Sequence, residues 1–329
     1  MQWGRLTCAC SVFILLACSP KSSVSSGNLI GFALADLDGR QKDRDRFVAV
    51  AESLGAQVIV QNAGGEHATQ LKQCADMLER DIKLLVIEPA DPVEAASIVE
   101  QAHEKNVKVI CYDYMIDMAP VDLCVSFDRV KAGEMQAQSV FQHAPQGNYL
   151  ILLGDADDKP AGRLHQGHMN VLRDAIYAGR ITIADKAECP HWSGDSAHVI
   201  AQTALSKGKI DAVIASNDAL AAGAIAALEA QGVAGTVPVS GMNASARNCR
   251  YIEAGKQLMS VLPPVERMAA RAARLAVTLA NGGVVDEVDT QVFNGSEEVP
   301  VILLQPSAVT KENLKQHVIA AGSYEKEEF

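Results

Sequence analysis

Short apolar runs alternate with amphipathic segments along most of this chain. In the first half the runs predict strands, and the segments between them have the spacing of helices that face a core. The expected strands span residues 29–35, 57–63, 84–89, 108–114 and 123–127, and the expected helices span 41–54, 68–80 and 92–105. Because these strands are apolar almost throughout, we expect a parallel sheet with helices on both faces.

A second set of elements begins with a helix near Arg129. Strands are expected over 149–154, 181–186, 212–216 and 237–241, with helices over 161–178, 194–206, 219–228 and 246–255. The remaining elements are a strand over 258–261, a helix over 265–281, a strand over 299–304 and a final helix over 311–321. A chain of 329 residues is long for a single core. The pattern therefore predicts an α/β protein of two Rossmann-like lobes with parallel sheets, joined by several crossings and separated by a cleft.

The N-terminus has the features of an export signal. Arg5 precedes an apolar run at 12–16 that is too short to span a membrane. The run Leu15-Leu16-Ala17-Cys18 resembles the bacterial lipoprotein box, in which the cysteine is lipidated; an ordinary signal peptide is the alternative. We expect a lipoprotein signal peptide at 1–17 and a lipid anchor with a serine-rich tether at 18–28. This predicts a protein of the periplasm or cell envelope, held at the membrane by its lipid alone.

Charge and cysteine content narrow the class of partner. The net charge is −11 and the sequence has no basic run, which argues against a nucleic-acid partner. Five cysteines follow Cys18, an odd number with no C-x-x-C spacing, so neither a zinc site nor a redox motif is indicated. We interpret them as small buried residues, with a bridge between Cys111 and Cys124 as the alternative.

Signatures of catalysis are missing from the sequence. It has no G-x-S-x-G, G-x-G-x-x-G or Walker loop. His165 and His168 share a predicted helix, but this spacing is more typical of a surface feature than of a metal site. The acidic run at 155–158 begins like a calcium loop, yet Pro160 and Gln166 stand where that loop needs glycine and glutamate. We therefore expect no enzyme activity, no metal and no cofactor.

Polar residues recur where the predicted strands end. Asn217 and Asp218 follow one strand, and Asn217 can also cap the next helix. The other positions of this kind are Asp36, Asp38, Glu88, Asp113, Asp128, Asp155 and Asn243. Ligands of open α/β sheets bind at the carboxyl ends of the strands, and carboxylates and amides suit sugar hydroxyls, which need partners when buried. Trp192 would offer a plane for the C–H face of a sugar ring; covering the edge of a core is the alternative.

Several segments resemble the D-xylose-binding branch of the periplasmic sugar-binding proteins, which are type I solute-binding proteins of ABC importers. These segments are QKDRDRFVAVAESLGAQVIVQNA at 41–63, CYDYMI at 111–116, VSFDRVKAGEMQAQ at 125–138, ASNDALAAGAIAALEAQG at 215–232 and VTKENLK at 309–315. The likeness is collinear over residues 29–322. It implies a monomeric receptor that closes by a hinge on a monosaccharide, a xylose-like pentose or a hexose, and delivers it to an ABC permease. The alternative is a sugar-sensing co-receptor that presents its closed state to a membrane kinase or chemoreceptor.

The resemblance also implies the limits of the two lobes. Lobe 1 would comprise residues 29–127 with a return segment at 262–291, and lobe 2 residues 128–261 with a C-terminal segment at 292–329. Three crossings would join them, near 127–129, 259–264 and 292–300.

Ligand-binding residues are implied by the same resemblance. Asp113, Asp158, Trp192 and Asn217 match positions of the family's site. Other positions depart from it: Arg40 lies beside the place of an Arg-Trp pair, Tyr114 and His165 replace arginines, Asn243 replaces an aspartate, and Pro160 and Pro263 replace an asparagine and a lysine. The expected ligand-binding set is Arg40, Asp113, Tyr114, Asp158, His165, Trp192, Asn217 and Asn243, with lipidation at Cys18. The missing charges leave the identity of the sugar open.

Overall fold

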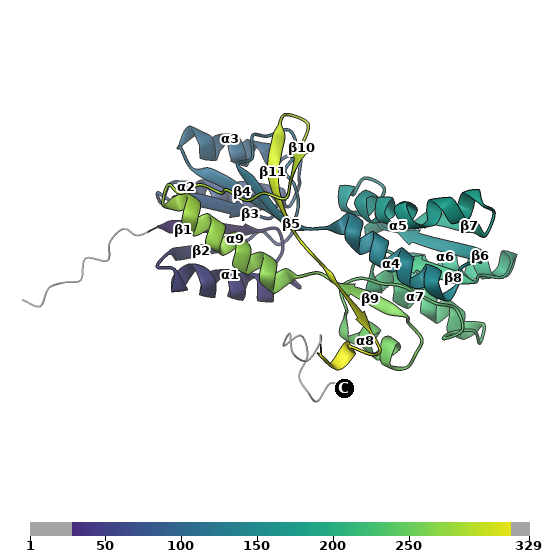
Figure 1. Cartoon of the computed structure of the whole chain (residues 1–329). Helices are drawn as coiled ribbons and strands as arrows, with labels where there is room; N and C mark the ends of the chain where they lie inside the picture. The colour runs from purple at the N-terminus through teal and green to yellow at the C-terminus, as the bar shows by residue number, and fades with distance from the viewer. Residues whose placement is uncertain (1–27, 317–329) are drawn as a thin grey trace, which may run out of the picture.

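A seven-stranded sheet forms the centre of the first lobe. The computed structural model describes residues 28–316, which fold into two lobes with crossing segments between them (Figure 1). The strand order is β10-β11-β5-β4-β3-β1-β2, and β10 alone is antiparallel to its neighbour. The strands are β1 (Leu29–Leu34), β2 (Gln57–Asn62), β3 (Leu84–Ile87), β4 (Lys108–Tyr112), β5 (Leu123–Phe127), β10 (Thr290–Phe293) and β11 (Glu298–Leu304).

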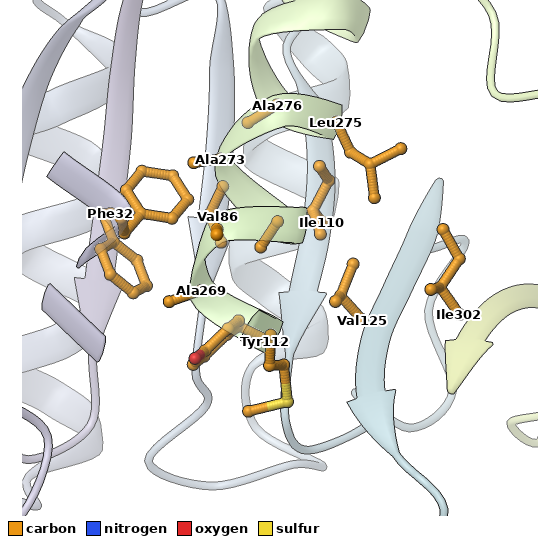
Figure 2. Packing of buried hydrophobic residues seen from close by; sticks show 14 of the residues in the cluster. Phe32, Val86, Ile110, Tyr112, Val125, Ala269, Ala273, Leu275, Ala276 and Ile302 are labelled. Atoms are coloured by element: carbon orange, nitrogen blue, oxygen red, sulfur yellow. The ribbon is translucent and has the colours of Figure 1, made fainter. Parts of the chain in front are cut away.

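Helices cover both faces of this sheet, so its strands are buried on both sides. On one face α1 (Gln41–Ser53) and α9 (Val265–Ala280) pack against Phe32, Val86 and Ile110. Figure 2 shows Ala269, Ala273 and Ala276 of α9 over these strands. Their short side chains let the helix lie close to the sheet. On the other face, α2 (His67–Leu78) and α3 (Ala96–Glu104) pack against residues such as Ala33, Leu85 and Ile87.

The second lobe has a smaller parallel sheet with the order β7-β6-β8. Its strands are β6 (Gly147–Leu153), β7 (Ile181–Glu188) and β8 (Ala212–Ala215). One face is covered by α4 (Arg129–His143) and α5 (Lys159–Tyr177), and the other by α6 (Gly194–Lys207) and α7 (Asp218–Ala230). The antiparallel pair β9 (Met259–Leu262) and β12 (Ser307–Thr310) and the helix α8 (Ala246–Glu253) complete the lobe. The predicted α/β class and the two lobes with parallel sheets are confirmed.

Two glycines explain how closely α4 and α5 approach one another. A Cβ at Gly133 would overlap the carbonyl oxygen of Leu164, and a Cβ at Gly167 would overlap that of Val130. Only glycine fits at either position without a shift of the backbone. This close contact sets the position of the first turns of α5, which face the other lobe.

The C-terminal part of the chain differs from the expected arrangement. Residues from position 292 onward were expected in lobe 2, but β11 pairs in parallel with β5, from Val301 beside Cys124 to Leu304 beside Phe127. The buried side chains of Val299 and Val301 hold β11 in the first lobe. The third crossing therefore lies at residues 305–306, between β11 and β12, and not at 292–300.

Several smaller points complete the comparison between the expected and the observed elements. Residues 237–241 were expected to form a strand, but the structure has only two isolated bridges there, Val239 with Val213 and Val237 with Ala234. Residues 317–321 of the helix expected over 311–321 lie outside the described residues, as do the signal segment and Cys18. Cys111 and Cys124 are adjacent on β4 and β5, and they are free thiols like the other three buried cysteines of the described chain. None of the described helices is both long and apolar enough to cross a bilayer.

Candidate functional site

A cavity of about 590 Å³ lies where the strand ends of the two lobes face each other. The first lobe contributes the loop before α1, the first turn of α1 and the residues after β4 and β5. The second lobe contributes the start of α5, the segment after β7, the end of β8 and the loop before α8. The lining side chains that carry a charge are Asp38, Arg40, Lys42, Asp43, Asp113 and Arg129, three of each sign. The cavity is therefore suited to an uncharged, polar ligand.

Asp113 is held between two guanidinium groups on the first-lobe side of the cavity. Its Oδ2 lies 2.5 Å from Arg40 Nη2, and its Oδ1 lies 2.6 Å from Arg129 Nη2. Burial alone would raise the pKa of Asp113, but the charges of Arg129 and Arg40 outweigh it and lower the pKa to about 2. The carboxylate is thus ionised at neutral pH and fixed in orientation, with further lone pairs available for a ligand hydroxyl.

The backbone at Asp113 is held just as firmly as its side chain. Its φ of 67° places it in the left-handed region, which is unfavourable for a residue other than glycine. The Asp113 N–H donates to Val125 O, and Ser126 Oγ donates to Asp113 O at 2.7 Å. Arg129 Nη1 donates to Ser126 Oγ at 2.8 Å. These bonds keep the chain in a strained turn that directs the carboxylate into the cavity, as is common at functional sites.

Two further carboxylates, those of Glu88 and Asp43, form ion pairs with Arg40. Glu88 Oε1 lies 2.5 Å from Arg40 Nη2, and Asp43 Oδ1 lies 3.5 Å from Arg40 Nη1. The Tyr112 hydroxyl donates a hydrogen bond to Asp43. Burial raises the pKa of Glu88 to about 7 although Arg40 opposes this shift. Arg40 is therefore fixed by three acidic side chains.

Trp192 forms part of the second-lobe wall. It ends the short 3₁₀ helix η1 (Pro190–Trp192) that follows β7, and its Nε1 donates to Asp158 Oδ2 at 3.1 Å. A Cβ at Gly154 would overlap the indole, so the ring lies directly against the backbone at that position. Asp158 is not one of the cavity-lining residues, and one of its carboxylate oxygens accepts the indole N–H, which orients the ring.

Asn217 and Asn243 are the amides of the second-lobe wall. Asn217 caps α7 as predicted: its Oδ1 accepts from the Leu220 N–H at 2.9 Å, which leaves its amide Nδ2 to donate to a ligand. Asn243 lies in the loop before α8. The buried Asp218 fixes this loop by accepting the Ser245 N–H at 2.6 Å, and burial raises the pKa of Asp218 to about 6. Asp218 is thus a structural residue.

The structure therefore brings together six of the eight expected side chains. Arg40, Asp113, Tyr114, Trp192, Asn217 and Asn243 line the cavity, while Asp158 and His165 do not. His165 is half-buried beside His168 in α5, with the two ring centroids 6.1 Å apart. Leu164 takes the cavity-lining place, and the next residue of a helix is turned about 100° away from it. His165 therefore does not line the cavity, and its ligand-binding role stays a prediction from the resemblance.

Sequence reasoning did not include Arg129, Asp43 or Lys42 in the site. Arg129 directly follows the first crossing, and its full burial against Asp113 shows only in three dimensions. Asp43 lies one helical turn after Arg40, a spacing that brings opposite charges together. Within residues 28–316 no group of three or more histidine, cysteine or acidic side chains could hold a metal ion.

Two lobes of parallel strands with a polar cavity between their facing ends define a two-lobed ligand-binding protein. Residues 30–283 match the family model described as the periplasmic binding protein domain. The chain belongs to the periplasmic binding protein family. It is a binding protein and not an enzyme, as the sequence predicted.

Curated relatives and solved structures agree with this membership. The chain is 41% identical over 304 residues to the D-xylose-binding periplasmic protein of Escherichia coli K12, covering 91% of this chain and 92% of that protein. It is 39% identical to the protein of the same name from Haemophilus influenzae, covering 93% of each. An ABC transporter solute binding protein from Clostridium phytofermentans with bound β-D-glucose shares 26% identity and a TM-score of 0.79, covering 92% of this chain and 99% of that chain. The predicted resemblance is confirmed.

Proposed function

We propose that this protein captures a neutral monosaccharide in the cavity between its lobes and delivers it to an ABC importer. The observation that carries the proposal is the ionised Asp113, fixed between Arg40 and Arg129 at the point where both lobes face the cavity. A fixed carboxylate and two guanidinium groups offer acceptors and donors to sugar hydroxyls. Relatives named for D-xylose binding and a neighbour solved with β-D-glucose support a pentose or hexose as the ligand.

Capture would proceed by closure of the two lobes about their crossings. A ligand favours the closed state only through contacts that the open state does not make. Asp113 and Arg40 belong to the first lobe, whereas Asn217 and Trp192 belong to the second. A sugar that bonds both groups would stabilise the closed arrangement, and that arrangement would be the form recognised by the permease.

Calorimetric titration with D-xylose, D-glucose and D-ribose tests the proposal. We expect at least one sugar to bind and to change the fluorescence of Trp192, the only tryptophan that follows the predicted signal. Asp113→Asn should abolish or strongly weaken this binding. Asp174→Asn, an exposed change on α5, is the matched control and should bind like the unaltered protein. Titrations without heat or fluorescence change for every sugar would contradict the proposal.

We further propose that the mature protein is a lipoprotein anchored through Cys18. The support is the sequence Leu15-Leu16-Ala17-Cys18 alone, since Cys18 lies outside the described residues. In cells that express the chain, the unaltered protein should fractionate with membranes, and Cys18→Ala should move it to the soluble envelope fraction. Equal distribution of the two forms would argue for an ordinary signal peptide.

A further inference from the structure

The two walls of the cavity differ sharply in chemistry. The charged lining residues come from the first lobe or from the β5–α4 crossing: Asp38, Arg40, Lys42, Asp43, Asp113 and Arg129. The facing wall comes from the second lobe and the crossing that leads back from it. Besides Trp192, Asn217 and Asn243, the residues that line it include Pro160, Met242, Leu262 and Pro263; Leu164 also belongs to this wall but is fully buried. A ligand in this cavity thus meets all of the charged lining groups on one side, and on the other side two amides, the Trp192 indole and otherwise hydrocarbon.

The polar groups of the second lobe near this wall are mostly used within the protein. The Trp192 N–H is donated to Asp158, and one oxygen of Asp218 accepts from Ser260 Oγ at 2.8 Å. His165 does not line the cavity. Among the described residues of the second-lobe wall, Asn217 and Asn243 remain as side-chain amides, and the Oδ1 of Asn217 is occupied by its helix. Few partners are left for ligand hydroxyls on this side.

We infer that the preferred ligand is a monosaccharide that bears a methyl or other small alkyl group on the side facing Met242, Leu262 and Pro263. Its hydroxyls would face Asp113 and the arginines. This inference rests on the proposed sugar-binding function. A hydroxyl buried against such a wall without a partner weakens binding by about 5- to 150-fold, whereas a methyl group in the same place is stabilised by burial. A 6-deoxyhexose and an alkyl glycoside both have this chemistry.

Matched pairs of sugars test the inference by calorimetry on the mature protein. Three pairs test a 6-deoxyhexose: D-galactose with D-fucose, D-glucose with 6-deoxy-D-glucose, and L-mannose with L-rhamnose. The fourth pair, D-xylose with methyl β-D-xyloside, tests whether the alkyl group belongs to a glycoside. We expect the methyl-bearing member of at least one pair to bind 5-fold or more tightly than its partner. Equal or weaker binding of the methyl-bearing member in every pair would overturn the inference and leave the proposed function intact. Failure of all eight sugars to bind would instead contradict the proposed function.

A substitution in the apolar wall provides the second test. Met242→Gln keeps the length of the side chain and adds a hydrogen-bonding end, so it should reduce the preference for the methyl-bearing sugar by at least 5-fold. Met242→Leu keeps the wall apolar and should retain the preference. Pro263→Asn, at a half-exposed crossing residue, repeats the test if Met242→Gln fails to fold. An unchanged preference in the folded polar variant would overturn the assignment of this wall.

Discussion

Lys159 and Asp117 form an ion pair between the two lobes. Lys159 is the first residue of α5 in the second lobe, and its Nζ lies 2.7 Å from Asp117 Oδ1 in the β4–β5 connection of the first lobe. The connection itself is held by Asn294, whose side-chain amide donates to the carbonyls of Ile116 and Ala119. The ion pair therefore joins a residue of each lobe and can form only when the lobes are close.

Loss of this ion pair should weaken the closed state. Because Lys159 is largely exposed, we expect the pair to contribute about 0.2–1 kcal/mol, so Lys159→Met should raise the Kd for the bound sugar about 1.5- to 5-fold. Calorimetry at low and high salt would measure this, and the effect should shrink at high salt. Lys131→Met is the matched control, since Lys131 pairs with Glu134 inside α4. Identical affinities in the two variants would contradict the role of the pair.

Removal of the Asp113 charge should destabilise the fold as well as the site. Arg129 is buried, and without the Asp113 charge its guanidinium would lose its carboxylate partner, whereas Arg40 would keep Glu88 and Asp43. Breaking a buried ion pair from one side costs about 3–5 kcal/mol. Urea unfolding of Asp113→Asn without ligand should show a loss of this size. The exposed Asp174→Asn should unfold like the unaltered protein, and an unchanged midpoint for Asp113→Asn would refute the prediction.

Glu88 should make stability fall as the pH rises towards neutrality. Burial raises the pKa of Glu88 from its ordinary value of 4.5 to about 7 in the folded protein. Between these values the folded state holds a proton that the unfolded state has released, so the contribution of Glu88 to stability decreases with pH, by at most about 1.4 kcal/mol per pH unit. Comparison of unfolding free energies with Glu88→Gln from pH 4.5 to 7 isolates this contribution. The difference between the two proteins should change steadily over that window; a constant difference would exclude the effect.

The contact between α4 and α5 should not tolerate a side chain at Gly133. Alanine there would overlap the carbonyl of Leu164 and push α5 away from α4, at a cost of about 1–3 kcal/mol. Gly162→Ala on α5 is the matched control, because no atom lies within 4 Å of its added Cβ and alanine favours a helix. Thermal unfolding should therefore show a lower Tm for Gly133→Ala and an equal or higher Tm for Gly162→Ala. Equal Tm values would contradict the packing argument.

The sequence predicts the buried elements best. Central strands such as β3 are apolar on both faces, so their pattern is unambiguous. The edge strand β10 was missed because its residues are alternately half-buried and exposed, and only β11 pairs with it. The expected place of the last crossing was wrong for a related reason: apolar patterning shows that β11 is a strand but does not show which sheet it joins.

Site residues that directly follow strands could be predicted from the sequence. Site residues on helices were harder to predict, because the sequence does not show which face of the helix points into the cavity. Asp113 and Asn217 directly follow strands and line the cavity. His165 was expected there from resemblance, but α5 presents Leu164 at that place. Arg129 and Asp43 were missed because a charged side chain gives no sign of burial until its partner is known.

The crossings at the ends of β5, β9 and β11 mean that neither lobe is a continuous piece of the polypeptide. A fusion with a relative at one junction after β5 would leave β10 and β11 of this chain in a sheet whose strands β1–β5 come from the relative. A functional chimera that exchanges a whole lobe would need three splice points, at residues 128, 263 and 305. Recombination with fewer junctions would build one sheet from strands of two different proteins, so a new ligand preference cannot be acquired by exchanging a single continuous segment.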